Sequence, residues 1–202
     1  MKSFENTKLI SDQVEPQELS VIMREFRSVL DKSVPGDVIE LGCYEGTTSL
    51  FLQRELMKSK AEKKLWLYDS FEGLPNKSSA DSSPAGLQFK TGELLASKQT
   101  LISNFKKSSL PIPRIKKAWF SDLKPSDLPD KISFAFLDGD YYASIWDSLS
   151  LVWPKLSEGA VVIVDDYSSE ALPGAAKAVN DWLKRHPADL KVESSLAVIY
   201  RH

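Results

Sequence analysis

Two short apolar runs, each ending abruptly in acidic residues, constrain the fold of this chain more than any other feature. Residues 134–137 and 161–164 are too short for helices, and runs that are apolar on both faces are typical of strands buried in a parallel sheet. Neighbouring parallel strands lie about 4.8 Å apart, and ligands bind outside their carboxyl ends in open α/β sheets. We therefore expect the acids that end the two runs to share one small volume. They are Asp138, Asp140, Asp165 and Asp166.

This set of acids favours a metal-ion site. Several carboxylates at that separation cannot all stay ionised without a cation. A ligand set made only of oxygen suits Mg²⁺ or a similar hard ion. The alternative interpretation is that Asp138 and Gly139 mark a turn, and that Asp165 and Asp166 cap the next helix. Acids end both runs and a cap needs only one acid, so the metal site is the favoured interpretation.

Strands and helices are predicted to alternate along most of the chain. This alternation is typical of right-handed parallel βαβ units, so we expect a three-layer α/β sandwich around a mostly parallel, twisted sheet. The polar, proline-containing stretch after Asp69 predicts a lid or insertion at about 75–110, the alternative being a mobile insertion without a role. The expected helices cover 16–32, 47–58, 142–153 and 174–185, and the expected strands cover 37–42, 65–68, the region of Ile115, 133–137, 160–164 and 196–200.

Composition limits the classes of protein to consider. The chain has 202 residues, enough for one domain with a sizeable core. Its 26 basic and 28 acidic residues give a net charge of −2, which argues against a general nucleic-acid-binding protein. The single cysteine, Cys43, excludes an internal disulfide framework, and with two histidines a zinc site is improbable. No signal peptide and no membrane-spanning run is visible, so we expect a cytoplasmic protein with no membrane partner.

A glycine-containing turn follows the first predicted strand. Gly42 and Gly46 flank this turn, which lets a ligand approach the backbone, and the helix that begins at Thr47 offers unpaired N–H groups. Asp69, at the end of the next strand, is placed to accept hydrogen bonds from ribose hydroxyls, although it could instead cap a turn. The spacing lacks the close glycine pair of dinucleotide binders, so S-adenosylmethionine is the favoured cofactor.

The motifs, in their order along the chain, resemble the macrocin O-methyltransferase family, which methylates sugar hydroxyls of macrolide and aminocoumarin antibiotics. The string Asp-Ser-Phe-Glu-Gly-Leu-Pro at 69–75 is the most specific part of the resemblance. The helix after Asp166 departs from the family pattern at Ala176, where the family often has a basic residue. The other matching stretches are 38–42, 45–46, 119–122, 137–142, 165–167 and 173–174.

The resemblance implies a single domain over 1–202 with the Rossmann-like class I methyltransferase fold. It implies that Asp138, Asp165 and Asp166 hold Mg²⁺, and that Asp140 is the general base. It also implies an O-methyltransferase with a sugar-like or other small hydroxyl acceptor, and suggests a homodimer. Trp119 and Phe120 could stack on adenine or belong to the core. The expected cofactor-binding residues are Glu40, Gly42, Glu45, Gly46, Thr47, Asp69, Ser70, Trp119, Phe120 and Asp138.

Three other functions stay open because a fold does not fix a function. The first is a metal-dependent hydroxylase built on the same fold and acids. The second is a non-catalytic protein that binds S-adenosylmethionine. The third, a nicotinamide-dependent oxidoreductase, is disfavoured by the glycine spacing.

Overall fold

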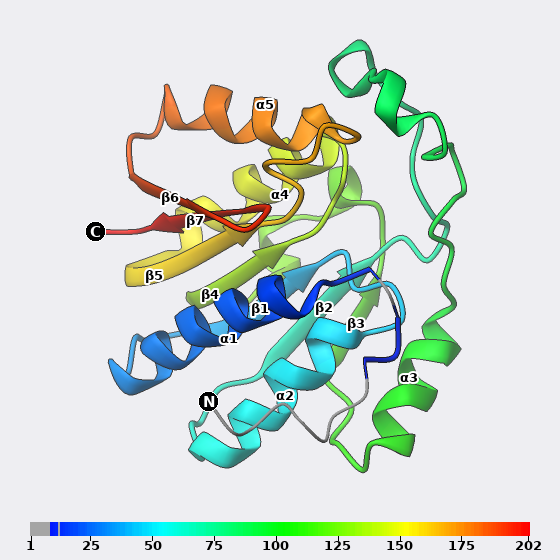
Figure 1. Ribbon diagram of the computed structural model, residues 1–202. Coiled ribbons are helices and arrows are strands. Elements are labelled where there is room, and N and C mark those ends of the chain that lie inside the picture. Colours follow the sequence, from blue (N-terminus) through cyan, green and yellow to red (C-terminus); the bar gives the residue numbers. More distant parts are fainter. Residues whose placement is uncertain (1–8, 12) are drawn as a thin grey trace.

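A twisted, mostly parallel sheet forms the middle layer of the computed structural model, which describes residues 9–11 and 13–202 (Figure 1). Its strands are β1 (Asp37–Leu41), β2 (Leu65–Asp69), β3 (Arg114–Lys117), β4 (Ile132–Leu137), β5 (Leu156–Val164), β6 (Asp189–Glu193) and β7 (Leu196–Tyr200). The order across the sheet is β3-β2-β1-β4-β5-β7-β6. The first five of these strands pair in parallel, and β7 is antiparallel to both β5 and β6. The expected α/β sandwich is confirmed.

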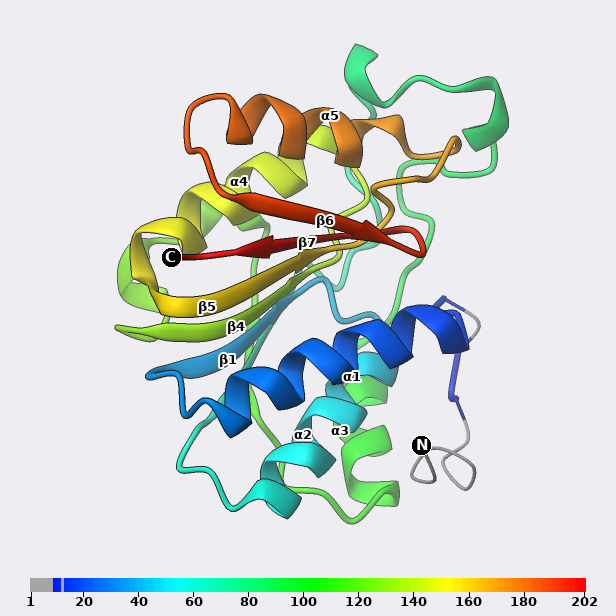
Figure 2. The same cartoon turned by 60° about the vertical axis from the view of Figure 1, so that its left-hand side comes forward.

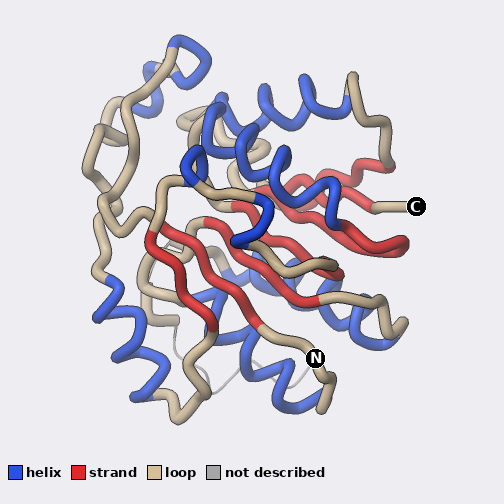
Figure 3. The backbone as a smooth tube through the Cα atoms, turned by 180° about the vertical axis from the view of Figure 1, so that it is seen from behind, coloured by secondary structure: helices blue, strands red, loops and turns tan. Residues whose placement is uncertain are grey.

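Helices cover both faces of the sheet. α1 (Pro16–Asp31), α2 (Thr47–Ser59) and α3 (Lys98–Lys107) lie on one face, and α4 (Tyr142–Val152) and α5 (Pro173–Leu183) lie on the other (Figure 2). Seen from behind, the same three layers are visible (Figure 3). Each face has its own apolar cluster, and all six residues of β4 are buried between the two. β4 is therefore the centre of the core, and its carboxyl end is surrounded by other chain segments.

The structure differs from the expected elements in two places. α3 lies in the stretch expected to be a loop. It is short and polar, and Leu101 and Phe105 are its only buried residues. The strand β6 was not expected either. It alternates polar and apolar residues at the edge of the sheet and buries none of them fully. In both elements, contacts with the rest of the fold stabilise a segment whose own sequence signal is weak.

The chain between β2 and α3, residues 70–97, contains two short 3₁₀ turns and no α-helix or strand (Figure 1). We call this segment the insertion. It lies beside the carboxyl ends of the parallel strands, next to the starts of α4 and α5. Among the described residues, every helix is too short or too polar to cross a bilayer.

Candidate active site

Backbone hydrogen bonds hold the carboxyl ends of three neighbouring strands together. Asp138 donates its N–H to Leu41 at 2.8 Å, and Asp165 donates its N–H to Leu137 at 2.9 Å. Gly42 has a φ of +87°, and a Cβ atom there would lie 1.8 Å from the carbonyl oxygen of Asp138. Only glycine allows this approach. The turn after β1 and the acids after β4 are thereby brought into contact, and the ends of β4 and β5 lie side by side, as the pattern of the two apolar runs predicts.

A cavity of about 330 Å³ opens at this edge of the sheet. Its wall comes from the turns after β1, β2, β3, β4 and β5, from the insertion, from the first turn of α1 and from the first two turns of α4. The residues of the wall that were expected from sequence to form the site are Gly42, Asp69, Ser70, Trp119, Phe120, Asp138, Asp140, Asp165 and Asp166. The sequence therefore locates most of one continuous site.

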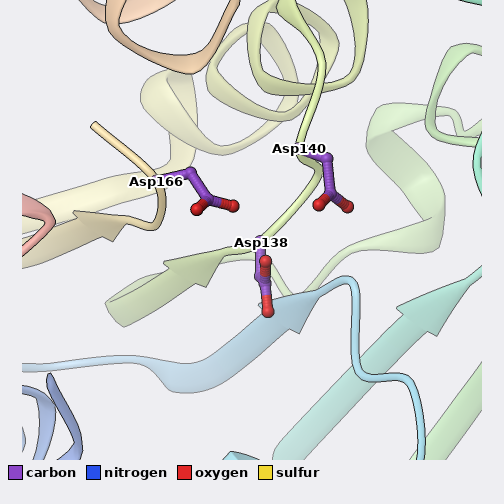
Figure 4. Close-up of side chains that lie close together, drawn as sticks. All are labelled: Asp138, Asp140 and Asp166. Atoms are coloured by element: carbon purple, nitrogen blue, oxygen red, sulfur yellow. The ribbon is translucent and has the colours of Figure 1, made fainter. Parts of the chain in front are cut away.

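Three of the acids converge on one point of the cavity. Asp138, Asp140 and Asp166 each offer an oxygen atom, and these oxygens all lie within 4.8 Å of one another (Figure 4). The backbones of Asp140 and Asp166 are left-handed, with φ of +60° and +57°, a conformation that aspartate tolerates better than most residues. Asp165 is only 6% exposed, and its Oδ1 accepts a hydrogen bond of 2.8 Å from the N–H of Asp166. Asp165 therefore supports the turn as well as lining the cavity.

Burial and the charges of neighbouring acids raise the pKa of Asp138, Asp140, Asp165 and Asp166. The pKa of Asp140 rises to about 8, because of burial and then because of the charges of Asp166 and Asp69. That of Asp166 rises to about 6, through burial and the charge of Glu18. The pKa values of Asp138 and Asp165 are raised well above the ordinary range, with burial again the main cause. The cluster therefore disfavours its own full ionisation.

The donor set fits a hard divalent cation. The wall carries seven acids, and within the described chain none of its residues is a lysine, arginine or histidine. Carboxylate oxygens are the ligands that Mg²⁺ prefers, and a bound cation would relieve the repulsion among them. The acids of the wall are Glu18, Asp69, Asp138, Asp140, Asp147, Asp165 and Asp166.

Asp69 organises the turn after β1. Its Oδ2 accepts hydrogen bonds from the N–H groups of Cys43 at 2.9 Å and Tyr44 at 3.0 Å, and its Oδ1 accepts one from Phe71 at 2.7 Å. The turn-cap interpretation of Asp69 is therefore confirmed as one of its roles. Because Asp69 also lines the cavity, a ribose contact stays a prediction.

Four of the expected cofactor residues lie outside the cavity wall. Glu40 is buried and its Oε2 accepts a hydrogen bond of 2.5 Å from Ser49; burial raises its pKa to about 8. The carbonyl of Glu45 accepts a hydrogen bond from Asn104, which joins this turn to α3. Gly46 packs against Leu101, and Thr47 shares a hydrogen bond of 2.7 Å with Ser11. These residues shape the turn and the start of α2.

Sequence reasoning missed several residues of the wall. Glu18 projects from α1 and is held by a hydrogen bond from the hydroxyl of Ser195, in the turn between β6 and β7. Asp147 comes from α4, and burial raises its pKa. Phe89 and Leu94 come from the insertion. None of them follows a predicted strand, so the pattern that locates the other acids could not find them.

Comparisons with known proteins agree with this architecture. The family described as Macrocin-O-methyltransferase (TylF) matches residues 13–202. The 8-demethyl-8-(2,3-dimethoxy-alpha-L-rhamnosyl)-tetracenomycin-C 4'-O-methyltransferase of Streptomyces olivaceus is 32% identical over 167 residues. That match covers 79% of this chain and 62% of the relative, so the chain spans less than two thirds of the relative's length.

Solved structures share the fold. The O-methyltransferase NovP has a TM-score of 0.79 and 27% identity, covering 92% of this chain and 79% of NovP. The O-methyltransferase from Bacillus cereus, solved in complex with SAH (S-adenosylhomocysteine), has a TM-score of 0.59 and 12% identity, covering 96% and 84% of the two chains. The fold of this chain is that of the class I methyltransferases.

Proposed function

The chain belongs to the macrocin O-methyltransferase family, and from that premise we propose that it transfers a methyl group from S-adenosylmethionine to a hydroxyl of a sugar-like small molecule, assisted by Mg²⁺. The observation that carries the proposal is the convergence of Asp138, Asp140 and Asp166 on one cavity, beside the glycine turn of β1. A donor that bears a positive sulfonium and an acceptor that must lose a proton both suit an acidic, partly buried site.

The cofactor would occupy the half of the cavity formed by the ends of β1, β2 and β3. Gly42 leaves space beside the backbone there, and Asp69 and Ser70 present polar atoms at the end of β2. Trp119 and Phe120 line the same half and offer flat apolar surface for a purine ring. We keep Glu40, Glu45, Gly46 and Thr47 as residues that support this half through the turn and the start of α2.

The acids after β4 and β5 would perform the chemistry. We assign Asp138, Asp165 and Asp166 as the residues that hold Mg²⁺ and Asp140 as the general base. When bound, Mg²⁺ would orient the acceptor oxygens and lower the pKa of the hydroxyl that it polarises. Asp140 lies within reach of the same point, so it can accept the proton as the hydroxyl oxygen takes the methyl group. The cavity wall would hold donor and acceptor next to each other, which contributes further to the rate.

The wall also indicates the chemical class of the acceptor. Seven acids without a basic side chain among the lining residues disfavour an acceptor that bears phosphate or carboxylate. Leu74, Phe89, Leu94 and Leu172 add an apolar surface on the side of the insertion. An uncharged polyol attached to an apolar group satisfies both parts of the wall. A homodimer and a cytoplasmic location stay predictions.

The first experiment is a thermal-unfolding series with purified protein. S-adenosylhomocysteine would be added with and without Mg²⁺, and NAD would serve as the control. A ligand at about 100 times its Kd stabilises by about 2.7 kcal/mol, which raises the Tm of a protein of this size by roughly 5–10 °C. We expect a shift with S-adenosylhomocysteine and none with NAD. If neither nucleoside ligand shifts the Tm, the methyltransferase proposal is wrong.

The same protein would then be given neutral glycosides as acceptors. Binding of S-adenosylhomocysteine without methylation of any polyol would favour the non-catalytic alternative. Methylation of a phosphorylated sugar in preference to the neutral one would contradict the acceptor class.

A further inference from the structure

The insertion is joined to the turn that carries Asp140 by one buried carboxylate. Asp81 belongs to the insertion but is only 1% exposed, and its Oδ1 accepts a hydrogen bond of 2.6 Å from the backbone N–H of Tyr142. Tyr142 begins α4 and stands two residues after Asp140. Its N–H is one of the groups at a helix start that have no partner within the helix. The insertion therefore caps α4 from a distance of 61 residues along the chain.

The surroundings of Asp81 are shaped to hold it there. Its Oδ2 accepts hydrogen bonds from both the N–H and the hydroxyl of Ser78, at 2.9 and 2.5 Å. Gly174, in the first turn of α5, has no side chain on this side: a Cβ there would lie 1.8 Å from the Oδ1 of Asp81 and 2.7 Å from the nitrogen of Tyr142. The carboxylate thus sits in a closely fitted space between the starts of α4 and α5.

A second contact joins the same two segments. Tyr141, only 1% exposed, donates its hydroxyl hydrogen to the carbonyl of Phe89 in the insertion at 3.2 Å. Its ring packs in a small apolar cluster with Leu74 and Leu172. Both residues that follow Asp140 are therefore held by the insertion, one through its side chain and the other through its backbone.

Asp140 itself needs such support. Its φ of +60° is unfavourable for a residue with a side chain, and such conformations persist only where the surrounding structure imposes them. The N–H of Tyr141 donates a hydrogen bond of 2.6 Å to the carbonyl oxygen of Gly139, so the turn is tight. The restraints beyond the turn come from Asp81 and from the cluster around Tyr141.

We propose that Asp81 is a positioning residue that makes the conformation of the Asp140 turn depend on the insertion. Phe89 and Leu94 of the insertion line the cavity, so an acceptor that packs against them would also stabilise the turn that presents the base. The functional meaning rests on the proposed role of Asp140, but the contacts that join the two segments do not depend on it.

Hydrogen exchange of the full-length protein, followed by mass spectrometry, tests this coupling without turnover. One peptide would cover residues 75–90 of the insertion and another residues 138–146. Asp81→Ala removes the acceptor, and Asp81→Asn keeps an oxygen for the N–H of Tyr142. The matched control is Ser83→Ala, which removes a different link of the insertion, the hydrogen bond of 2.6 Å from the Ser83 hydroxyl to Glu170.

We expect Asp81→Ala to speed exchange about ten-fold or more in both peptides, as the loss of a buried hydrogen bond to a charged group implies. Asp81→Asn should restore slow exchange in residues 138–146. Ser83→Ala should affect the insertion alone. If Asp81→Ala does not fold, Ser78→Ala, which removes the hydroxyl that holds the Oδ2 of Asp81 and does not touch residues 138–146, should speed exchange in both peptides.

The proposal is overturned if the Asp81 and Ser78 variants loosen only the insertion, or if they speed exchange equally throughout the chain. Either result is independent of whether S-adenosylhomocysteine binds, so it is distinguishable from failure of the proposed function.

Discussion

The acids of the cavity and the acids of the outer surface respond to the fold in opposite ways. On α5, Asp181 bonds to Lys177 at 2.5 Å and to Lys184 at 2.9 Å, and these lysines lower its pKa to about 2. In the cavity, burial raises the pKa of Asp140 to about 8. Asp181 on the surface has two lysines beside it, whereas the cavity gathers seven acids in a wall whose described residues include no basic side chain. The difference supports the proposed binding of a cation in the cavity.

Turnover gives the largest expected contrast between the two regions. Asp140→Asn keeps the shape and the left-handed turn, since asparagine tolerates a positive φ, but removes the base. We expect the rate of methyl transfer to fall by about 10²–10⁴-fold, with the affinity for S-adenosylhomocysteine unchanged. Asp181→Asn, on the surface, should leave the rate unchanged. Rates would be measured with an acceptor that the wild-type protein methylates.

Turnover above a tenth of the wild-type rate in Asp140→Asn would remove the general-base assignment. Loss of Mg²⁺ binding in that variant would instead make Asp140 a metal ligand.

The pH dependence of stability gives the next contrast. Asp166 and Asp140, with pKa values raised to about 6 and about 8, bind more protons in the folded state, so the free energy of unfolding should fall as pH rises from about 4 to 8. We expect a loss of at least about 3 kcal/mol across this window without metal, which is what the raised pKa of Asp166 alone implies, and a smaller loss with Mg²⁺. Urea unfolding at several pH values, with and without Mg²⁺, measures both.

The surface acids should change the free energy of unfolding in the opposite direction, and at lower pH. The pKa values of Asp181 and Glu193 are lowered to about 2, so their contribution is present above pH 4.5 and is lost as the pH falls toward 2. If the free energy of unfolding of the metal-free protein rises between pH 5 and 8, the cavity acids do not destabilise the fold when they ionise, and this prediction is wrong.

Cofactor affinity is expected to change less. Asp69→Ala removes the acceptor for three backbone N–H groups of the turns after β1 and β2. We expect it to weaken binding of S-adenosylhomocysteine by about 1–3 kcal/mol, through the loosened turn and through unpaired ribose hydroxyls. Isothermal titration calorimetry measures the change. Ser59→Ala, remote from the cavity, is the control, and equal affinities in the two variants would place the cofactor elsewhere.

The smallest predicted effect is the change in stability when one cavity acid or one surface acid is neutralised. Asp166→Asn relieves repulsion in the metal-free cavity, and we expect it to stabilise the protein at pH 8 by about 1 kcal/mol. Asp181→Asn breaks exposed ion pairs and should not raise the Tm. Thermal unfolding at pH 8 gives the Tm of both variants. A lower Tm for Asp166→Asn than for the wild-type protein would show that the charge of Asp166 stabilises the fold.

The parts of the fold and site that the sequence predicts are those with strong local patterns. The apolar runs before Asp138 and Asp165 locate two core strands and place their acids at one edge. The short, polar helix α3 and the edge strand β6 lack such a pattern, because few of their side chains are buried. Sequence spacing also gives no sign that Asp81 caps Tyr142, or that Glu18 lines the cavity. Those contacts join segments far apart along the chain and depend on the finished fold.

The position of Trp119 makes ligand binding visible by optical means. The chain has five tryptophans, all of them described, and Trp119 is the one that lines the cavity. Trp146 and Trp153 both contact the ring of Trp182, and Trp66 lies under the guanidinium of Arg114. A purine that stacks on Trp119 would therefore quench the fluorescence of that one tryptophan, while the other four tryptophans would keep theirs. The protein carries its own fluorescent reporter at the site, and no label has to be attached.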